Sequence, residues 1–395
     1  MTKRMGMTGS HRRDAGGSAT TGSPIQRPTA IVFWLGWWLL ASNSLATRAA
    51  TVNDVVAAEM KEHHITGVSL AVIENGKITK AKGYGFTEEN ATTPVTTSTL
   101  FQAGSVSKPV AAFGALRLVE DRRLSLDEDV NRWLKNWKVP ENDFTKDEKV
   151  TLRRILSHSA GLTVHGFPGY VVGAPMPTLV EILDGSKPAN TAAIRVDVVP
   201  GSTSRYSGGG YTVMQQMMID VTGKPFPELM RQTVLTPLRM AASTYEQPLP
   251  KERGAAAATG YYADGKQVEG KWHLYPEMAA AGLWTTASDL ARFAIAIQQA
   301  LAGKSNPVIS QSMTRQMLTV QKGNSGLGLG LDGSGKTLRF SHGGRDEGFD
   351  TFMMAYAESG QGVVIMINAN DNSGAVNRIV DAVSREYHWP ERISN

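Results

Sequence analysis

The segment VSLAVIENGKITKA, residues 68–81, holds two runs of β-prone residues on either side of Glu74-Asn75-Gly76. Asn-Gly between two such runs is a strong short-range signal for a β-hairpin. Near the other end of the chain, three more strands are predicted at 337–341, 349–356 and 362–368, with a turn at 359–362. A hairpin at the start and three strands at the end predict one antiparallel sheet to which both ends of the chain contribute.

The sequence between these strands is mostly helical in pattern. Apolar periodicity predicts helices at 53–63, 110–120, 129–137, 211–221, 289–301 and 375–387, and Gly223 has the position of a helix C-cap. The expected fold is therefore α/β, of the α+β type: an antiparallel sheet flanked by helices, with an inserted and mostly helical domain. The predicted boundaries are 47–104 and 251–395 for the α/β domain and 105–250 for the helical domain.

The first 46 residues have the features of an export signal. Five basic residues precede the apolar run AIVFWLGWWLLA at 30–41, and Ser44-Leu45-Ala46 offers a small-x-small cleavage site. The run is shorter than the roughly 20 apolar residues that a membrane-spanning helix needs. We therefore expect a signal peptide at 1–46 and a periplasmic or secreted protein. The alternative is an uncleaved segment, which alone would bring the protein to a membrane.

Composition narrows the class of protein further. The chain has 395 residues, of which 41% are hydrophobic and 19% charged, as in a globular protein. It has no Cys, which excludes a disulfide scaffold, a Cys-ligated metal site and a Cys nucleophile. Without residues 1–46, its 36 basic residues nearly balance its 35 acidic ones. Such a balance argues against a nucleic-acid partner. The sequence leaves the oligomeric state open.

Two features resemble nucleotide or metal sites but lack the context that those sites need. The stretch 330–337 matches the phosphate-binding pattern G-x-x-x-x-G-K-[ST], but a strand and two glycines follow it in place of a helix. A hairpin turn is the better interpretation. His63 and His64 are adjacent in sequence, which is not the spacing of two metal ligands on a helix. No metal and no cofactor is therefore predicted.

Three short motifs could together carry nucleophilic chemistry. Ser105-x-x-Lys108 places an amine on the same helix face as a hydroxyl, which needs a base before it can attack. Tyr206, in the glycine-rich loop 205–210, could move a proton if it lies near the lysine. His342-Gly343-Gly344 follows a strand, and its glycines would allow a ligand to approach the backbone closely. Taken singly, each motif is better explained without a function, as a chance match, a core tyrosine and a tight turn respectively.

In this order the three motifs resemble those of the penicillin-recognising serine hydrolases, which read S-x-x-K, Y-x-N and K/H/W-x-G. The superfamily includes class C β-lactamases, DD-peptidases, D-aminopeptidases and family VIII carboxylesterases. The stretches 124–130, 156–162 and 281–293 are similar to shared stretches of these proteins, so the resemblance extends over about 52–390. It implies a β-lactamase/transpeptidase-like fold.

The resemblance also implies roles for individual residues. Ser105 would be the acylated nucleophile, Lys108 its activator, and Tyr206 the base in acylation and the acid toward the leaving group. His342 would occupy the place of a lysine in class C β-lactamases. The amides of Ser105 and Arg345 would form the oxyanion hole. Gly208, Gly343, Gly344 and His165 would line the substrate site, and Tyr170 and Trp284 are further candidates.

Two departures from the motifs bear on the substrate. Gly208 stands where β-lactamases and DD-peptidases have an Asn that holds the acylamino side chain, and Gly343 lacks a side chain to bind a lactam carboxylate. Each lost polar contact costs about 1–3 kcal/mol, so two could lower efficiency about a hundredfold. Family VIII carboxylesterases show such relaxed motifs.

We therefore expect a serine hydrolase that cleaves short-chain esters, with weak lactam hydrolysis still open. One alternative is a class C-like β-lactamase or a D-amino-acid-specific peptidase, and the partner in each case is a small-molecule ester or amide. Another alternative, of a different class, is a slowly deacylating penicillin-binding sensor.

Overall fold

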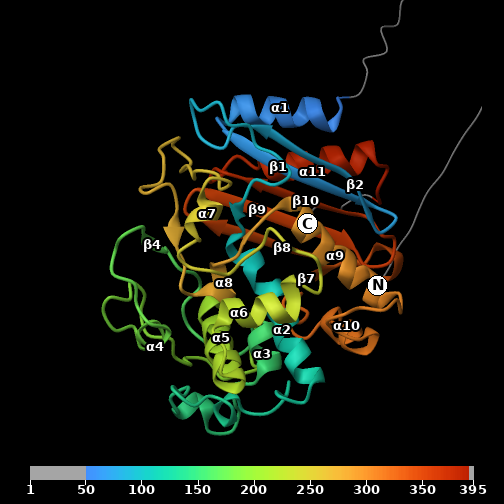
Figure 1. Ribbon diagram of the computed structural model, residues 1–395. Helices are drawn as coiled ribbons and strands as arrows, with labels where there is room; N and C mark the ends of the chain where they lie inside the picture. The colour runs from blue at the N-terminus through green and yellow to red at the C-terminus, as the bar shows by residue number, and fades with distance from the viewer. Residues whose placement is uncertain (1–49, 391–395) are drawn as a thin grey trace, which may run out of the picture. The chain divides into compact units, whose positions relative to one another are not determined.

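The computed structural model describes residues 50–390 and is built around a six-stranded antiparallel sheet (Figure 1). The predicted signal peptide lies outside the described residues. The strands are β1 (Gly67–Glu74), β2 (Lys77–Gly85), β7 (Gly330–Asp332), β8 (Arg339–Asp346), β9 (Phe349–Tyr356) and β10 (Gly362–Ile367), in the spatial order β2-β1-β10-β9-β8-β7. Val68 of β1 pairs with Ile367 of β10, so strands from both ends of the chain meet in the middle of the sheet. This confirms the predicted architecture.

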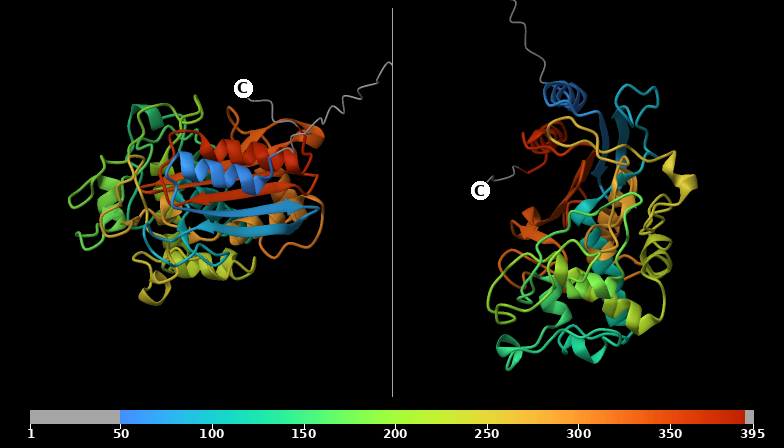
Figure 2. Two further views of the ribbon diagram at one scale, coloured as in Figure 1. Left: turned by 90° about the horizontal axis from the view of Figure 1, so that it is seen from above. Right: turned by 90° about the vertical axis from the view of Figure 1, so that its left-hand side faces the viewer.

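Successive side chains along each strand point to opposite faces of the sheet, and both faces are apolar. Val68, Leu70 and Val72 pack with helices α1 (Val52–Glu62) and α11 (Ala375–Glu386), which lie next to each other on that face (Figure 2). Ala71 and Ile73 join the larger core, which contains α9 (Ala287–Leu301) and the other helices. A sheet covered on both faces accounts for the nearly continuous burial of β1 and β10.

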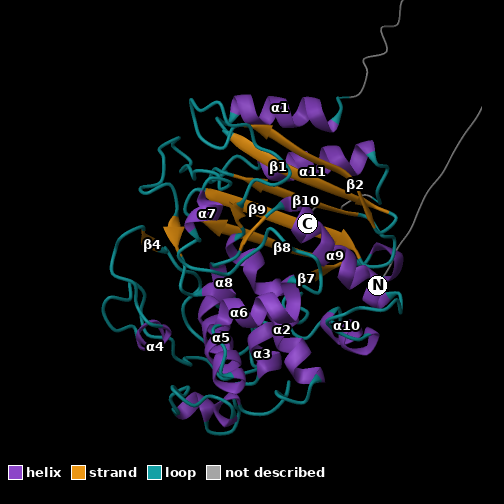
Figure 3. Cartoon of the chain, in the orientation of Figure 1, coloured by secondary structure: helices purple, strands orange, loops and turns teal. Residues whose placement is uncertain are grey.

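The helical part lies below the sheet in the view of Figure 3. The other α-helices of residues 50–390 are α2 (Ser107–Glu120), α3 (Leu152–Leu156), α4 (Leu179–Asp184), α5 (Gly208–Thr222), α6 (Phe226–Met230), α7 (Lys251–Gly254), α8 (Met278–Ala281) and α10 (Gln311–Met317). Two small sheets pair β3 (Phe101–Gln102) with β6 (Trp284–Thr285), and β4 (Tyr170–Val171) with β5 (His273–Leu274). One core runs from Met214 of α5 to Val364 of β10. The predicted boundaries at 105 and 250 stay a prediction. Between residues 50 and 390, no helix combines the length and apolar character needed to cross a membrane.

Two local predictions were wrong. The helix expected at 129–137 is only a 3-10 turn, Val130–Arg132. The backbone amides of Lys135 and Asn136 donate instead to the carboxylate of Asp220 on α5, which draws the chain out of helical geometry.

The third motif also differs from its predicted place, since residues 342–344 lie within β8 and not at the end of a strand. Gly343 and Gly344 pair with Phe352 and Thr351 of β9, which carries the strand on to Asp346. The phosphate-loop pattern at 330–337 consists of β7 followed by one 3-10 turn that leads into β8. The interpretation as a hairpin turn is confirmed.

Candidate active site

Ser105 lies in a 3-10 turn, Gly104–Val106, immediately before α2. Gly104 has φ +52°, a left-handed conformation that glycine adopts without strain. A Cβ at this position would lie 2.5 Å from the backbone nitrogen of Arg345 in β8. Glycine therefore permits both the turn that presents Ser105 and the close approach of strand β8 to it.

Lys108 follows in the first turn of α2 and is only 1% exposed. Its Nζ donates to Ser105 Oγ and to the carbonyl oxygen of Ala280 in α8, each at 2.8 Å. The same Nζ lies 5.0 Å from the ring centroid of Tyr206 and 5.8 Å from that of Tyr211. Hydroxyl, amine and phenol ring are thus grouped as the sequence predicts.

Tyr206 precedes α5 in a loop that is hydrogen-bonded to the segment 163–165. Ser207 is the N-cap of α5: its Oγ accepts from the Gly210 amide at 2.9 Å and donates to the Thr163 carbonyl at 2.8 Å. The Gly208 amide donates to the carbonyl of His165 at 3.0 Å. These bonds fix the backbone on the C-terminal side of Tyr206.

Gly208 faces this same segment, and not open space. A Cβ on Gly208 would lie 3.0 Å from the His165 carbonyl oxygen and 3.0 Å from the ring of Phe167. Gly208 is not among the residues that line the pocket described below. The place that an Asn side chain would take at the second motif is therefore filled by residues 165–167.

His342 of β8 is half-buried beside the pocket. Its Nδ1 lies 2.6 Å from the carbonyl oxygen of Gly343, which can only accept, so Nδ1 carries the proton and Nε2 is left as an acceptor. Burial, and then the nearby charge of Lys108, lower the pKa of His342 to about 4. At neutral pH the third motif therefore presents a neutral imidazole where class C β-lactamases would carry a cation.

The two glycines that follow differ in the space around them. A Cβ on Gly343 would meet only the ring of Phe352, at 4.0 Å. A Cβ on Gly344 would lie 2.0 Å from the Ala103 carbonyl oxygen and 2.9 Å from the Ser105 nitrogen. Strand β8 therefore lies directly against the turn that carries Ser105. An arrangement of this kind can direct backbone amides at a developing oxyanion.

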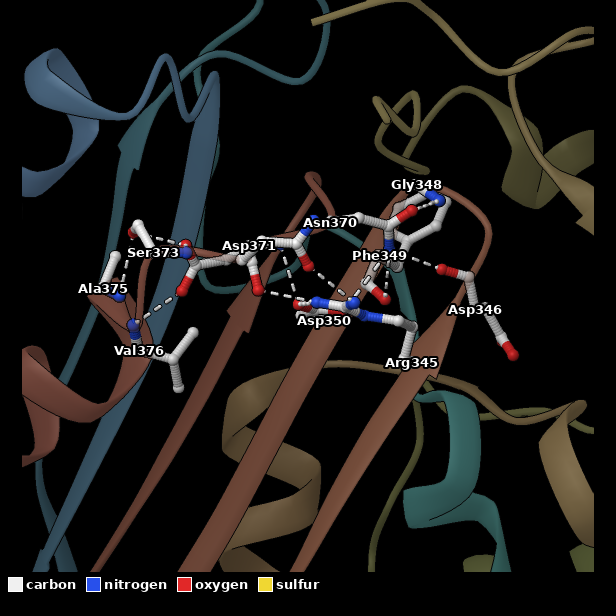
Figure 4. A network of polar contacts seen from close by, with 11 residues as sticks. Arg345, Asp346, Gly348, Phe349, Asp350, Asn370, Asp371, Ser373, Ala375 and Val376 are labelled. Atoms are coloured by element: carbon white, nitrogen blue, oxygen red, sulfur yellow. Dashed lines mark hydrogen bonds and ion pairs between the residues drawn. The ribbon is translucent and has the colours of Figure 1, made fainter. Parts of the chain in front are cut away.

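The side chain of Arg345 contacts the strand β9 and the loop after β10 (Figure 4). Its Nε and Nη2 bind the two carboxylate oxygens of Asp350 at 2.7 and 2.6 Å, and Nη2 also donates to the Asp371 carbonyl at 2.6 Å. Nη1 donates to Asn372 Oδ1 at 2.9 Å. The hydrogen bonds to Asp350 raise the pKa of Arg345. These bonds hold the guanidinium toward β9 and the loop after β10, while the backbone nitrogen of Arg345 lies against Gly104.

These elements surround a pocket of about 760 Å³, within the usual size range of small-molecule sites. Of the predicted site residues, the lining includes Ser105, Lys108, His165, Tyr206, His342, Gly343, Gly344 and Arg345. Tyr170 and Trp284 do not line it, so those two candidates were wrong. Tyr170 pairs with Leu274 in a small sheet, and Trp284 is fully buried against Trp272 and Phe349.

The lining also contains residues that the motifs did not point to. These are His158, Phe167, Ala280, Asn324, Ser325, Phe352, Asp371, Val376 and Asn377, among others. His158 falls within the stretch 156–162 that resembles a shared family stretch, so a signal existed for it. Ala280 acts through its carbonyl, which no side-chain pattern can reveal. Phe352 is brought in because it pairs across the sheet with Gly343.

Comparison with known protein families gives a match over most of the chain. A family model described as Beta-lactamase matches residues 52–385. The chain belongs to the Beta-lactamase family. The resemblance inferred from the three motifs is confirmed at the level of this family.

Individual relatives of this family member are distant. "Protein flp" of Staphylococcus aureus is 22% identical over 343 residues, which are 85% of this chain and 66% of that protein, so just under two thirds of the relative is spanned. The octameric penicillin-binding protein homologue from Pyrococcus abyssi has a TM-score of 0.72 at 23% identity, covering 86% of this chain and 77% of that one. D-alanine carboxypeptidase AmpC from Burkholderia cenocepacia has a TM-score of 0.68 at 20% identity, covering 85% and 97%. These likenesses confirm the predicted fold.

Proposed function

We propose that this chain is an exported serine hydrolase that cleaves short-chain carboxylic esters through an acyl-enzyme on Ser105. The observation that carries the proposal is the chemistry around the second and third motifs. Residues 165–167 fill the place of a substrate-binding Asn next to Gly208, and His342 is neutral at physiological pH. Gly343 leaves the ring of Phe352 as its nearest neighbour. Such a site favours a neutral, partly apolar ester over a lactam that bears a carboxylate and an acylamino group.

The proposed reaction uses groups whose positions are described above. Ser105 Oγ attacks the ester carbonyl carbon while its proton passes to Tyr206 in the phenolate form, which the charge of Lys108, whose Nζ is 2.8 Å from Oγ, stabilises. The carbonyl electrons move onto the oxygen, held by the amides of Ser105 and Arg345. The C–O bond to the alcohol then breaks, and Tyr206 returns the proton to the departing alkoxide. Water repeats the sequence on the acyl-enzyme and releases the acid and free Ser105.

The test is steady-state turnover by residues 47–395 of p-nitrophenyl butyrate beside a chromogenic cephalosporin. Ser105→Ala serves as the control for both substrates. We expect ester turnover that disappears in Ser105→Ala, with cephalosporin rates about a hundredfold lower, from two lost polar contacts. Comparable or faster cephalosporin hydrolysis would overturn the esterase proposal in favour of a β-lactamase. A burst equal to the enzyme concentration without later turnover would indicate a sensor.

A D-alanyl-D-alanine peptide belongs in the same assay, because one structural neighbour is a D-alanine carboxypeptidase. Release of D-alanine faster than ester cleavage would favour the peptidase alternative.

The export part of the proposal rests on the sequence of residues 1–46 alone. Expression of the full chain in a Gram-negative host, followed by N-terminal sequencing of the periplasmic fraction, tests it. A mature start at residue 47 is the expected result. Retention of Met1 in the membrane fraction would indicate an uncleaved anchor instead.

A further inference from the structure

His158 lies directly after α3, at a place in the backbone where few residues fit. Its φ is +54°, in the left-handed region that non-glycine residues seldom adopt. Strain of this kind persists where surrounding interactions hold it, and it is concentrated at functional sites. His158 also lines the pocket, half-buried, although none of the three motifs includes it.

The hydrogen bonds of His158 hold the chain on both sides of Tyr206. Its carbonyl oxygen accepts from the amide of Arg205 at 2.7 Å. Its ring Nδ1 accepts from the amide of Ser207 at 3.2 Å. One residue thus binds the backbone immediately before and immediately after the tyrosine.

The imidazole ring of His158 also stacks on the phenol ring of Tyr206. The two centroids are 4.1 Å apart and the planes are inclined by 29°. The other titratable groups around His158 are Lys108, Tyr211, His165 and His342. Burial, and then the charge of Lys108, hold the pKa of His158 well below its usual value. The ring is therefore neutral, and an Nδ1 that accepts from Ser207 requires its proton to be on Nε2.

We propose that His158 is the positioning residue for Tyr206: it fixes the tyrosine backbone by two hydrogen bonds and the phenol ring by stacking. The role rests on the proposed function of Tyr206 as the group that exchanges a proton with Ser105 and the leaving alcohol. A proton-transfer group that is displaced by about 1 Å loses about a hundredfold in rate. His158 would accordingly act on kcat and hardly on KM.

Two substitutions separate the two contacts. His158→Asn keeps a side-chain acceptor and tolerates the left-handed backbone, but it removes the stacked ring. His158→Phe keeps an aromatic ring and removes the acceptor. The matched control is His64→Asn, because His64 is exposed and has a similar φ of +53°. Thermal unfolding of all three variants reports whether they fold.

The deciding measurement is the leaving-group dependence of kcat for a series of butyrate esters with alcohols of increasing pKa. A poorly placed acid harms esters of basic alcohols most, because p-nitrophenolate departs without a proton. We expect His158→Asn to lower kcat about tenfold or more for ethyl butyrate, less for p-nitrophenyl butyrate, with KM nearly unchanged. An equal loss for all esters would overturn the proposal in favour of a merely structural role.

A double-mutant cycle with Tyr206→Phe gives a second readout, the rate at which a fluorophosphonate labels Ser105. If His158 acts through Tyr206, His158→Asn should change the labelling rate less than about twofold once the phenol hydroxyl is gone. The same fractional loss with and without the hydroxyl would overturn the proposal. Labelling does not need ester turnover, so failure of the esterase proposal and failure of the His158 proposal give different results.

Discussion

Gly344 lies so close to Ala103 that a Cβ on the glycine would stand 2.0 Å from the Ala103 carbonyl oxygen. Gly344→Ala must therefore push β8 away from the turn that carries Ser105, and with it the amide of Arg345. We expect kcat/KM for p-nitrophenyl butyrate to fall by at least about a hundredfold, as when an oxyanion donor is lost. The adjacent Gly343→Ala is the matched control, since its Cβ would meet only Phe352 at 4.0 Å. Similar losses in both variants would contradict this account.

The same comparison predicts which departure from the motifs can be reversed. Gly343→Thr places a hydroxyl in open space. We expect this variant to raise cephalosporin turnover relative to ester turnover by about tenfold, which is the effect of one added polar contact. Gly208→Asn should give no such gain, because its Cβ would meet the His165 carbonyl and the Phe167 ring at 3.0 Å. The ratio of the two rates in each variant is the measurement. A gain from Gly208→Asn alone would show that the segment 165–167 yields easily.

The pH dependence of kcat/KM should report the state of His342. Burial and the charge of Lys108 lower the pKa of His342 to about 4, so the imidazole stays neutral down to that pH. Below it, a second cation would form beside Lys108 and Ser105. We expect kcat/KM to stay constant through pH 5–7 and to fall as the pH passes through about 4. In His342→Asn this fall at acid pH should be altered. Circular dichroism at each pH checks that the protein stays folded. An acid limb near 6.5, the value for free histidine, would count against this environment.

Glu277, a buried carboxyl group at the start of α8, predicts a pH dependence of stability. Its side chain is 0% exposed, and burial raises its pKa to about 8, although the Tyr170 hydroxyl nearby opposes the shift. The folded state thus keeps a proton that the unfolded chain releases near pH 4.5. The free energy of unfolding should be greatest below that pH and should fall as the pH rises toward 8.

Urea unfolding at pH 5, 6.5 and 8 measures this effect. We expect Glu277→Gln to reduce the decrease in the free energy of unfolding between pH 5 and 8 by on the order of a few kcal/mol. The decrease that remains would come from the buried Asp346, whose pKa is also raised. The exposed Glu358→Gln is the control for removing one carboxylate. Equal slopes for wild type and Glu277→Gln would refute the prediction.

The sheet could be predicted from the sequence because its signals are local. Asn75-Gly76 specifies the hairpin, and the apolar runs in β9 and β10 specify buried strands. The segment 129–137 could not be predicted, because its amides are bound by Asp220 some 85 residues further along the chain. Strand β7 depends likewise on pairing with β8, and the extension of β8 to Asp346 depends on pairing with β9.

The candidate site was likewise predicted only in part from the sequence. Ser105 and Lys108 share a helix turn, so spacing alone brings them together, and the family resemblance supplied Tyr206 and His342. The motif letters said nothing of Ala280, whose carbonyl accepts from Lys108. They also gave Gly208 a place in the substrate site, whereas its position facing residues 165–167 appears only in three dimensions.

The backbone and the side chain of Arg345 make different contacts. Its backbone nitrogen lies against Gly104, which precedes Ser105, while its guanidinium binds Asp350 and the carbonyl of Asp371 in the loop after β10; both residues line the pocket. A mutation that widens the pocket by loosening that loop will therefore also disturb the alignment of the amide. We therefore expect substrate range and catalytic rate to change together in variants of this loop. Variants selected for bulkier esters should preserve the Arg345–Asp350 ion pair. Substitutions that admit larger substrates should instead occur in parts of the pocket lining outside β8, such as residues 324–325.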